Sequence, residues 1–433
     1  MHTPVQEFVE KWIRIAILNL AVVAAIGVVL RYKQALSLPG VDYKHLLHAH
    51  SHYAFAGWVS TALYTGIVHF LQPEQSALRY FRVLMQLHLA AALGMLFTFP
   101  FMGYAGPSIF FSTLSIFNSW WFAALSFRSL LQNRKKSVTP WMLTALCLMI
   151  LSAAGTFYLA WMMYHKTLNQ SLYFGAVYFY LHFQYNGWFL FGTGGLLISA
   201  LPATIPGHGK RALQRIFLVL LLTVIPTVFL SMLWMRIPGW MHAAGAFAAV
   251  VQLVALYYLW NVWMKSGFAD GVRLLKWENL LAAAGLTAFS LKLILQALSA
   301  VPLLNKYAFG VRPVVIGFLH LVLLGCITLL LLSFFIRQHY LRTNTRLAGW
   351  GLTLFTGAIL FNELVLLVQG FRAIAQEGMA QAPNLLLAAA LSMFSGITLF
   401  LTGQFTQRCQ RTSPPHQRQD HQAQQDDAHS KQE

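Results

Sequence analysis

The stretch HLLHAHSHYAFAGWVSTALYTGIVHF (His45–Phe70) joins a membrane-spanning composition to four histidines near its beginning. A run of about 20 predominantly apolar residues is long enough to cross a bilayer as a helix. Helical spacing places His45, His48 and His52 on one face and His50 roughly on the opposite face. Because ionisable side chains are costly in hydrocarbon, histidines in such a helix indicate a functional site.

The composition of the whole chain is that of a multi-pass membrane protein. Of its 433 residues, 58% are hydrophobic and 10% are charged, whereas soluble domains carry about 25% charged residues. The formal net charge of +18 comes from basic residues spread over short loops, so it does not indicate a nucleic-acid-binding face. The three cysteines are far apart and form no CxxC, which indicates neither a disulfide framework nor covalent haem attachment.

The apolar runs predict an all-α bundle of twelve spanning helices within residues 12–406. A short cytoplasmic segment, 1–11, precedes them, and the polar tail 407–433 is predicted to be disordered. We see no internal repeat and no soluble domain. The predicted spans are Trp12–Leu30, His45–Leu71, Arg79–Gly103, Pro107–Leu131, Pro140–His165, Leu172–Ala200, Ala212–Met235, Pro238–Met264, Leu274–Pro302, Pro313–Ile336, Leu347–Phe371 and Pro383–Thr406.

The distribution of Lys and Arg orients this bundle. The two termini and the loops after even-numbered spans hold 21 of these residues with their flanking turns, against 8 for the loops after odd-numbered spans. The positive-inside rule therefore predicts that both termini are cytoplasmic, which requires an even number of spans. We expect a bacterial inner (plasma) membrane protein whose first partner is lipid.

This orientation brings histidines from four spans to a similar depth. Four inward-running spans carry histidines near their outer ends, namely those at 45–52, His182, His242 and His320. At a rise of 1.5 Å per residue, His50, His182 and His320 lie roughly 8 to 15 Å below the outer end of their helices. Imidazoles from several helices at one depth, without cysteines or a carboxylate cluster, predict a haem or transition-metal site.

The same histidines also have simpler structural interpretations. His45, His48 and His242 can be interfacial residues, and His182 and His320 can be core histidines bonded to a neighbouring helix. His69 and His88 lie toward the cytoplasmic side, and we expect them to be structural.

Two further ionisable residues, Glu363 and Lys292, fall in the outer half of the bundle. They can form a buried ion pair, or Glu363 can move protons. The sequence does not decide between these interpretations.

Two motifs make the chain resemble the main subunit (subunit I) of the haem–copper oxidase and nitric-oxide reductase superfamily. They are His50-Ser-His-Tyr-Ala-Phe-Ala-Gly57 in the second span and Gly317-Phe-Leu-His320, with Gly325 five residues on, in the tenth. The resemblance covers residues 12–406 and implies a twelve-helix bundle. It also implies a low-spin haem b held by His50 and His320, with His52 as the alternative ligand in the second span.

The chain departs from that family at the reaction centre. Phe318 stands where the family has the histidine of its oxygen-reducing haem, the seventh span has no histidine, and Tyr185-Asn186 stands where a copper ligand is expected. Standard oxygen or NO reduction is therefore doubtful, and enzymatic activity is left open. A smaller site built from His182, His242 and a histidine of the second span such as His48 can still bind copper.

The sequence thus favours a haem-binding membrane protein that transfers electrons or responds to O2 or NO, with a small electron-carrier protein or a quinol as possible partner. One alternative is a transporter for a transition-metal ion or small solute, gated by the outer histidines. The other is a non-catalytic membrane assembly subunit.

Overall fold

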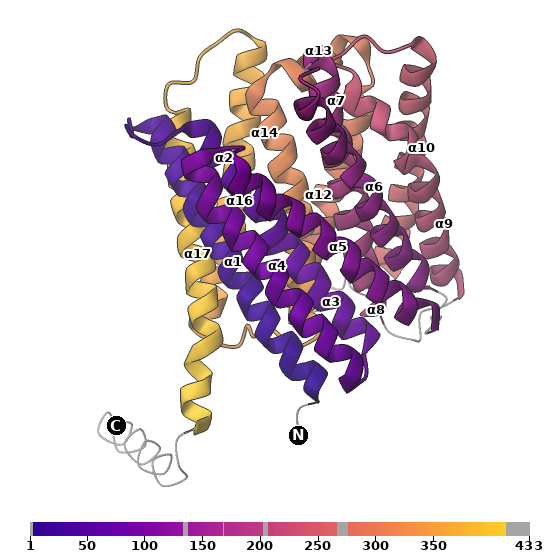
Figure 1. Ribbon diagram of the computed structural model, residues 1–433, viewed down its shortest axis with the longest axis vertical. Helices are drawn as coiled ribbons and strands as arrows, with labels where there is room; N and C mark the ends of the chain where they lie inside the picture. Colours follow the sequence, from indigo (N-terminus) through magenta and orange to yellow (C-terminus); the bar gives the residue numbers. More distant parts are fainter. Residues whose placement is uncertain (1–2, 133–136, 168, 202–206, 266–275, 413–433) are drawn as a thin grey trace.

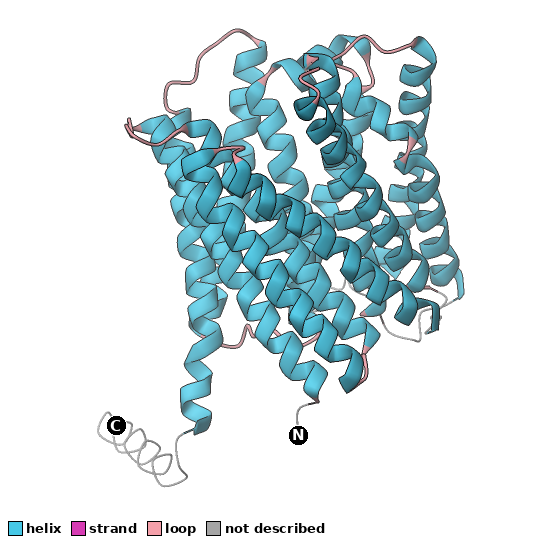
Figure 2. Ribbon diagram, viewed as in Figure 1, coloured by secondary structure: helices cyan, strands magenta, loops and turns pink. Residues whose placement is uncertain are grey.

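The computed structural model describes residues 3–132, 137–167, 169–201, 207–265 and 276–412. Every element in these ranges is a helix, and they contain no strand (Figure 2). Ten helices among the described residues are long and apolar enough to cross a membrane, and a bent pair of helices brings the number to eleven. The all-helical, multi-pass architecture is therefore confirmed, whereas the count of twelve spans stays a prediction.

The helices of the first half follow the predicted spans within a few residues, except at the start of α1. Three elements without a break make up the second predicted span, and three make up the sixth. The bounds are α1 (Pro4–Ala35), α2 (Tyr43–Tyr53), η1 (Ala54–Ser60), α3 (Thr61–Leu71), α4 (Gln75–Met102), α5 (Gly106–Gln132), α6 (Thr139–Tyr164), α7 (Gln170–His182), η2 (Phe183–Phe189) and α8 (Leu190–Ser199).

The second half follows the prediction in the same way, with one short extra helix, α13, before the tenth span. The bounds are α9 (Gly207–Val224), η3 (Pro226–Met232), α10 (Gly239–Lys265), α12 (Trp277–Ser299), α13 (Pro302–Gly310), α14 (Arg312–His320), η4 (Leu321–Thr328), α15 (Leu329–Arg337), α16 (Arg346–Ile374) and α17 (Ala382–Thr412).

The predicted terminal segments are partly helical. Thr3 caps α1 through a capping box with Gln6, so the segment predicted as 1–11 is helical from Pro4 onward. At the other end α17 continues to Thr412, and the rest of the predicted tail lies outside the described residues. The beginning of α1 and the end of α17 lie at the same end of the bundle (Figure 1). Which side of the membrane this is stays a prediction.

Two predicted spans account for the lower count of spanning helices. The chain is helical from Gln170 to Ser199, but this stretch, which carries His182, Gln184 and Asn186, is not among the ten apolar helices. The seventh predicted span is the bent pair, in which α9 and η3 meet at 51° just before Pro226. A proline lacks the N–H of a regular helix, which explains the break.

Three helices contain a π-helical segment, and each segment has a glycine five residues after a histidine. The glycines are Gly57 in η1, Gly187 in η2 and Gly325 in η4, and the histidines that precede these segments are His52, His182 and His320. The absence of a longer internal repeat stays a prediction. Wide π turns of this kind are frequent at functional sites.

Hydrogen bonds join the three π-helical segments in the interior of the bundle. The indole N–H of Trp58 in η1 donates to Oγ1 of Thr328 in η4 over 2.9 Å. The indole N–H of Trp188 in η2 donates to Oγ of Ser60 in η1 over 3.3 Å. All four side chains are buried. Hydrogen bonds therefore join the second, sixth and tenth predicted spans at positions that follow their histidines in the chain.

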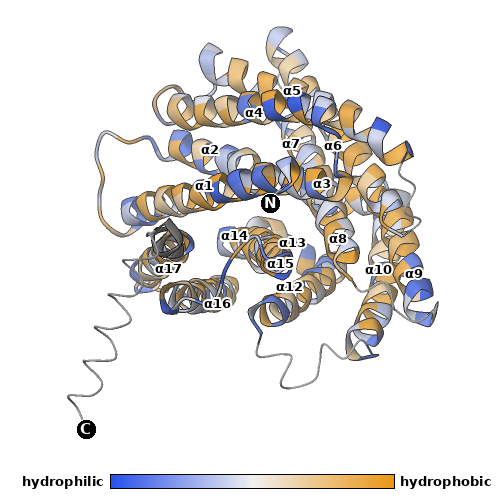
Figure 3. Ribbon diagram, turned by 90° about the horizontal axis from the view of Figure 1, so that it is seen from below, coloured by the Kyte–Doolittle hydropathy of each residue, from blue (hydrophilic) through white to orange (hydrophobic). Residues whose placement is uncertain are grey.

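Packing loosens along the tenth predicted span toward the end away from the termini. Seen along the bundle, α14 and α15 lie among α1, α12, α16 and α17 (Figure 3). Leu329–Ile336 of α15 is buried throughout, whereas α14 has no buried residue. The bundle therefore leaves room around α14. Elsewhere large apolar side chains face outward, such as Leu222 and Phe247, each 73% exposed, as expected of a surface in contact with lipid.

Candidate functional site

The histidines of α2 divide between two faces, as their spacing predicts. The ring of His52 stacks on Phe99 of α4 at 4.5 Å, and its Nε2 lies 3.0 Å from the hydroxyl of Tyr104. The ring of His48 packs edge-on against Tyr104 at 4.7 Å. His45 lies against Gly103, where no side chain would fit. These three histidines therefore hold α2 against the end of α4.

His50 points the other way, toward α1. A Cβ atom built on Gly27 would lie 3.4 Å from Cε1 of His50, so the glycine gives the imidazole its space. The ring also lies near the backbone of Val23. Its Nδ1 is nevertheless buried without a partner of hydrogen-bond geometry. A buried polar atom left in this state costs about 1–3 kcal/mol, which calls for an explanation.

His320, at the end of α14, is the second histidine of this kind. Its Nδ1 is also buried without a hydrogen-bond partner, although the ring lies near the backbone of Ile316 one turn earlier. It is within electrostatic range of His50. The structure therefore brings together His50 and His320, from the second and tenth predicted spans.

The helix that carries His50 is fixed at both ends. At its beginning the Asp42 carboxylate accepts the backbone N–H of His45 at 2.8 Å, and this hydrogen bond holds the pKa of Asp42 below its ordinary value. At its other end, η1 has carbonyl groups that accept hydrogen bonds from neighbouring helices. His88 of α4 donates to Ala56 at 2.9 Å, and Asn19 of α1 donates to Gly57 at 2.6 Å.

One arginine lies near the His50–His320 pair, and a second lies near the first. Arg31 of α1 is within electrostatic range of both histidines, of Glu363 and of Arg312. Arg312, at the start of α14, donates to the hydroxyl of Tyr43 at 3.0 Å. Neither arginine forms an ion pair with a described residue. The sequence analysis missed them, because arginines at helix ends were counted only as determinants of topology.

His182 is a satisfied core histidine. Its Nε2 lies 2.8 Å from the carbonyl oxygen of Val224, which can only accept, so Nε2 carries the proton. Its Nδ1 then accepts from the Asn186 amide at 3.1 Å and from the Ser231 hydroxyl at 3.3 Å. The Val224 carbonyl lies at the break between α9 and η3. His182 therefore stabilises that break and has no free nitrogen for a metal.

The predicted copper ligands are not brought together. His242 uses its Nε2 to donate to the carbonyl of Ala300, the residue that ends α12, over 2.7 Å. His48 lies against Tyr104, on the side of α2 that faces α4. Across the part of the chain that the structure describes, no group of three His, Cys, Asp or Glu residues could hold a metal ion.

Comparisons with known proteins leave the family open. The sequence matches no family model, and no curated protein is significantly similar to it. The function is therefore argued from the arrangement of the side chains described above.

Lys292 and Glu363 do not form the ion pair that the sequence left possible. Lys292 is 3% exposed and lies within electrostatic range of His182 and Cys326. Glu363 accepts the Asn362 amide at 3.1 Å and is in range of Arg31 instead. The two ionisable groups belong to different parts of the bundle.

Proposed function

We propose that this protein binds a b-type haem between α2 and α14, with His50 and His320 as the axial ligands of its iron. The haem would transfer single electrons near the outer face of the membrane, or respond to O2 or NO when one ligand dissociates. A small electron-carrier protein or a quinol would be the partner in the first case. The iron supplies the redox and gas-binding chemistry, and the residues described here bind and orient it.

The observation that carries this proposal is that His50 and His320, each with a buried Nδ1 that lacks a hydrogen-bond partner, lie within electrostatic range of each other. Histidines that ligate a metal through Nε2 commonly donate Nδ1–H to a backbone carbonyl. The backbones of Val23 and Ile316, beside His50 and His320, are in place for that role. Every residue of α14 keeps some exposed surface, and a large apolar ring would cover it.

Arg31 and Arg312 add a second feature that fits the same cofactor. Haem carries two propionate groups, and arginine binds carboxylates through short, charge-assisted hydrogen bonds. Arg31 is within electrostatic range of both histidines, Arg312 is within range of Arg31, and neither forms an ion pair with a described residue. We propose that Arg31 and Arg312 would bind the two propionate groups of the haem.

The resemblance to oxidase main subunits supports a haem but not their reaction centre. Both ring nitrogens of His182 form hydrogen bonds with protein groups, and one ring nitrogen of His242 donates to a carbonyl. We therefore do not extend the proposal to copper or to oxygen reduction. Metal transport gated by outer histidines has little support either, because His48 and His52 pack on aromatic rings.

The proposal is tested by expressing the full chain with ample haem and recording its absorption spectrum after purification. We expect a Soret band and the sharp α band of a reduced low-spin haem. The variants His50→Ala and His320→Ala should each lose the low-spin signal, because one axial ligand is missing.

His52→Ala is the matched control, since His52 lies on the other face of the same helix and should leave the spectrum unchanged. A preparation without a Soret band refutes the proposal. An unchanged spectrum in His320→Ala assigns the ligand to another residue.

A further inference from the structure

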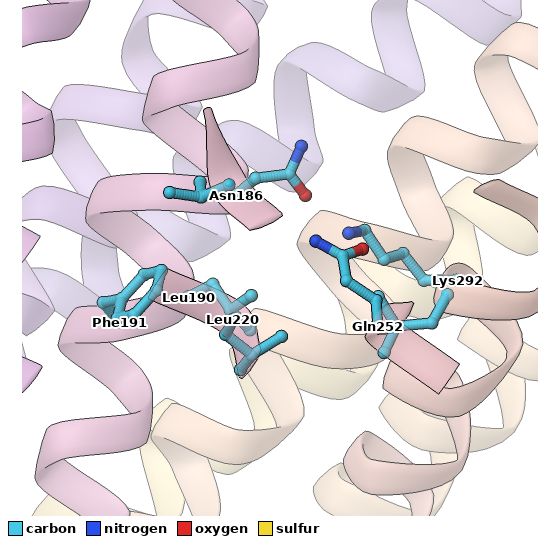
Figure 4. Close-up of a pocket in the computed structure, with 8 residues that line it drawn as sticks. Asn186, Leu190, Phe191, Leu220, Gln252 and Lys292 are labelled. Carbon is cyan, nitrogen blue, oxygen red and sulfur yellow. The ribbon is translucent and has the colours of Figure 1, made fainter. Parts of the chain in front are cut away.

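A second polar site lies away from the histidine pair. Figure 4 shows a small cavity to which η2, α9, α10 and α12 contribute, with the side chains of Asn186, Gln252 and Lys292 lining it. Leu190, Leu220 and Val224 are among the apolar residues that complete its wall. The space suits an occupant about as large as one water molecule.

Lys292 is the one ionisable side chain that lines this cavity. It is 3% exposed, and among the described residues it has neither an ion pair nor a hydrogen bond. Its two electrostatic neighbours, His182 and Cys326, are not carboxylates. A buried ammonium group without a counter-charge is strongly destabilising, so Lys292 either loses its proton or has a negative charge bound beside it.

The amide groups around Lys292 are held in fixed orientations. Gln252 donates through Nε2 to Thr223 at 3.1 Å and accepts through Oε1 from Gln296 at 3.1 Å. Asn186 donates through Nδ2 to His182, which leaves its Oδ1 buried without a partner. Lys292 thus supplies N–H donors at this cavity, and Oδ1 of Asn186 is an acceptor without a partner.

We propose that this cavity binds a small inorganic anion beside Lys292, of halide size. The anion would neutralise the ammonium group, while a second Lys292 N–H satisfies Asn186. A larger anion such as a carboxylic acid does not fit a space of this size. The proposal is independent of the haem, because it uses α9, α10 and α12 rather than α2 and α14.

The test compares the purified full-length protein in chloride, bromide and gluconate at equal ionic strength. Chloride and bromide should raise Tm by about 2 °C or more over gluconate, because a ligand that binds the folded state stabilises it. Crystals grown in bromide should show an anomalous peak beside Lys292. Equal Tm values in halide and gluconate refute the site.

Two variants separate this site from general salt effects. Lys292→Met removes the charge at similar volume and should abolish the halide dependence, whereas Lys306→Met, on exposed α13, should keep it. If Lys292→Met does not fold, Gln252→Glu supplies a carboxylate in the cavity and should also abolish the dependence. A halide shift that survives in either cavity variant overturns the proposal. The Soret band should be the same in all of them.

Discussion

The histidines of this protein differ in what their ring nitrogens contact. His88, His182 and His242 each bond a backbone carbonyl in a buried or partly buried setting, two of them where a helix departs from regular α geometry and one where a helix ends. Such histidines stabilise the fold. His50 and His320 each leave a buried nitrogen without a partner. His88 also leaves its Nδ1 buried without a partner. At the scale of the residue, His50 and His320 differ from it because they lie within electrostatic range of each other and of Arg31.

The arginines near that pair give a prediction at the same scale. Arg31→Met and Arg312→Met should each weaken haem retention by roughly tenfold to a hundredfold, because a hydrogen bond to a charged group contributes about 1.5–3 kcal/mol. Each should also lower the midpoint potential of the haem, since loss of a nearby positive charge favours the ferric iron. Haem content and redox titration measure the two effects.

Arg346→Met, with an exposed side chain at the other end of the bundle, is the control and should change neither quantity. Normal haem content and potential in both arginine variants would remove the arginines from the site.

The sequence predicted part of this site. The spacing of His45, His48, His50 and His52 on a helix is enough to place them on two faces, because that depends on local geometry alone. The bond of His182 to Val224 could not be predicted, since it depends on a helix break 42 residues away in the chain. The place of Arg31 and Arg312 at the site could not be predicted either, because it depends on how α1, α2 and α14 pack.

At the scale of the element, the π-helical segments are the feature that hydropathy cannot show. A wide turn leaves the length of a predicted span almost unchanged, so the predicted spans have nearly correct ends but no internal detail. In η1 the carbonyl of Ala56 accepts from both His88 and Thr61, and that of Gly57 accepts from Asn19. Buried polar side chains on α1 and α4 therefore stabilise a distortion in their neighbour.

This role predicts a loss of stability without a loss of ligands. His88→Leu should lower the free energy of unfolding by about 1–3 kcal/mol, because it removes a hydrogen bond to a buried carbonyl. Thermal unfolding in detergent measures the change. The substitution His208→Leu, at an exposed position, should be close to neutral. Equal stability of the two variants would show that His88 does not hold η1.

At the scale of the whole molecule, the sequence predicted the class and nearly all helix ends, because apolar length and proline position determine both. The count of twelve spans stays a prediction, and the stretch of α7, η2 and α8, which carries buried polar groups, is not among the ten clearly apolar helices of the described residues. The side of the membrane on which the termini lie remains a prediction from the distribution of basic residues.

Orientation is tested with single cysteines in intact cells. Gly40→Cys, in the loop between α1 and α2, should react with a membrane-impermeant maleimide added outside. Gln72→Cys, in the loop at the opposite end, should react only after the cells are opened. The reverse pattern would invert the topology and place the histidine pair on the cytoplasmic side.

The wide turns in the second, sixth and tenth predicted spans also determine how this chain tolerates changes in length. Each residue of an α-helix turns the chain by about 100°. A π turn holds one more residue than an α turn, so a return to ordinary winding would absorb the deletion of a single apolar residue from η4 and leave His320 almost in place. Replacing the wide turn by ordinary winding at unchanged length would instead rotate His320 away from His50, in a sequence that looks the same to any measure of membrane character.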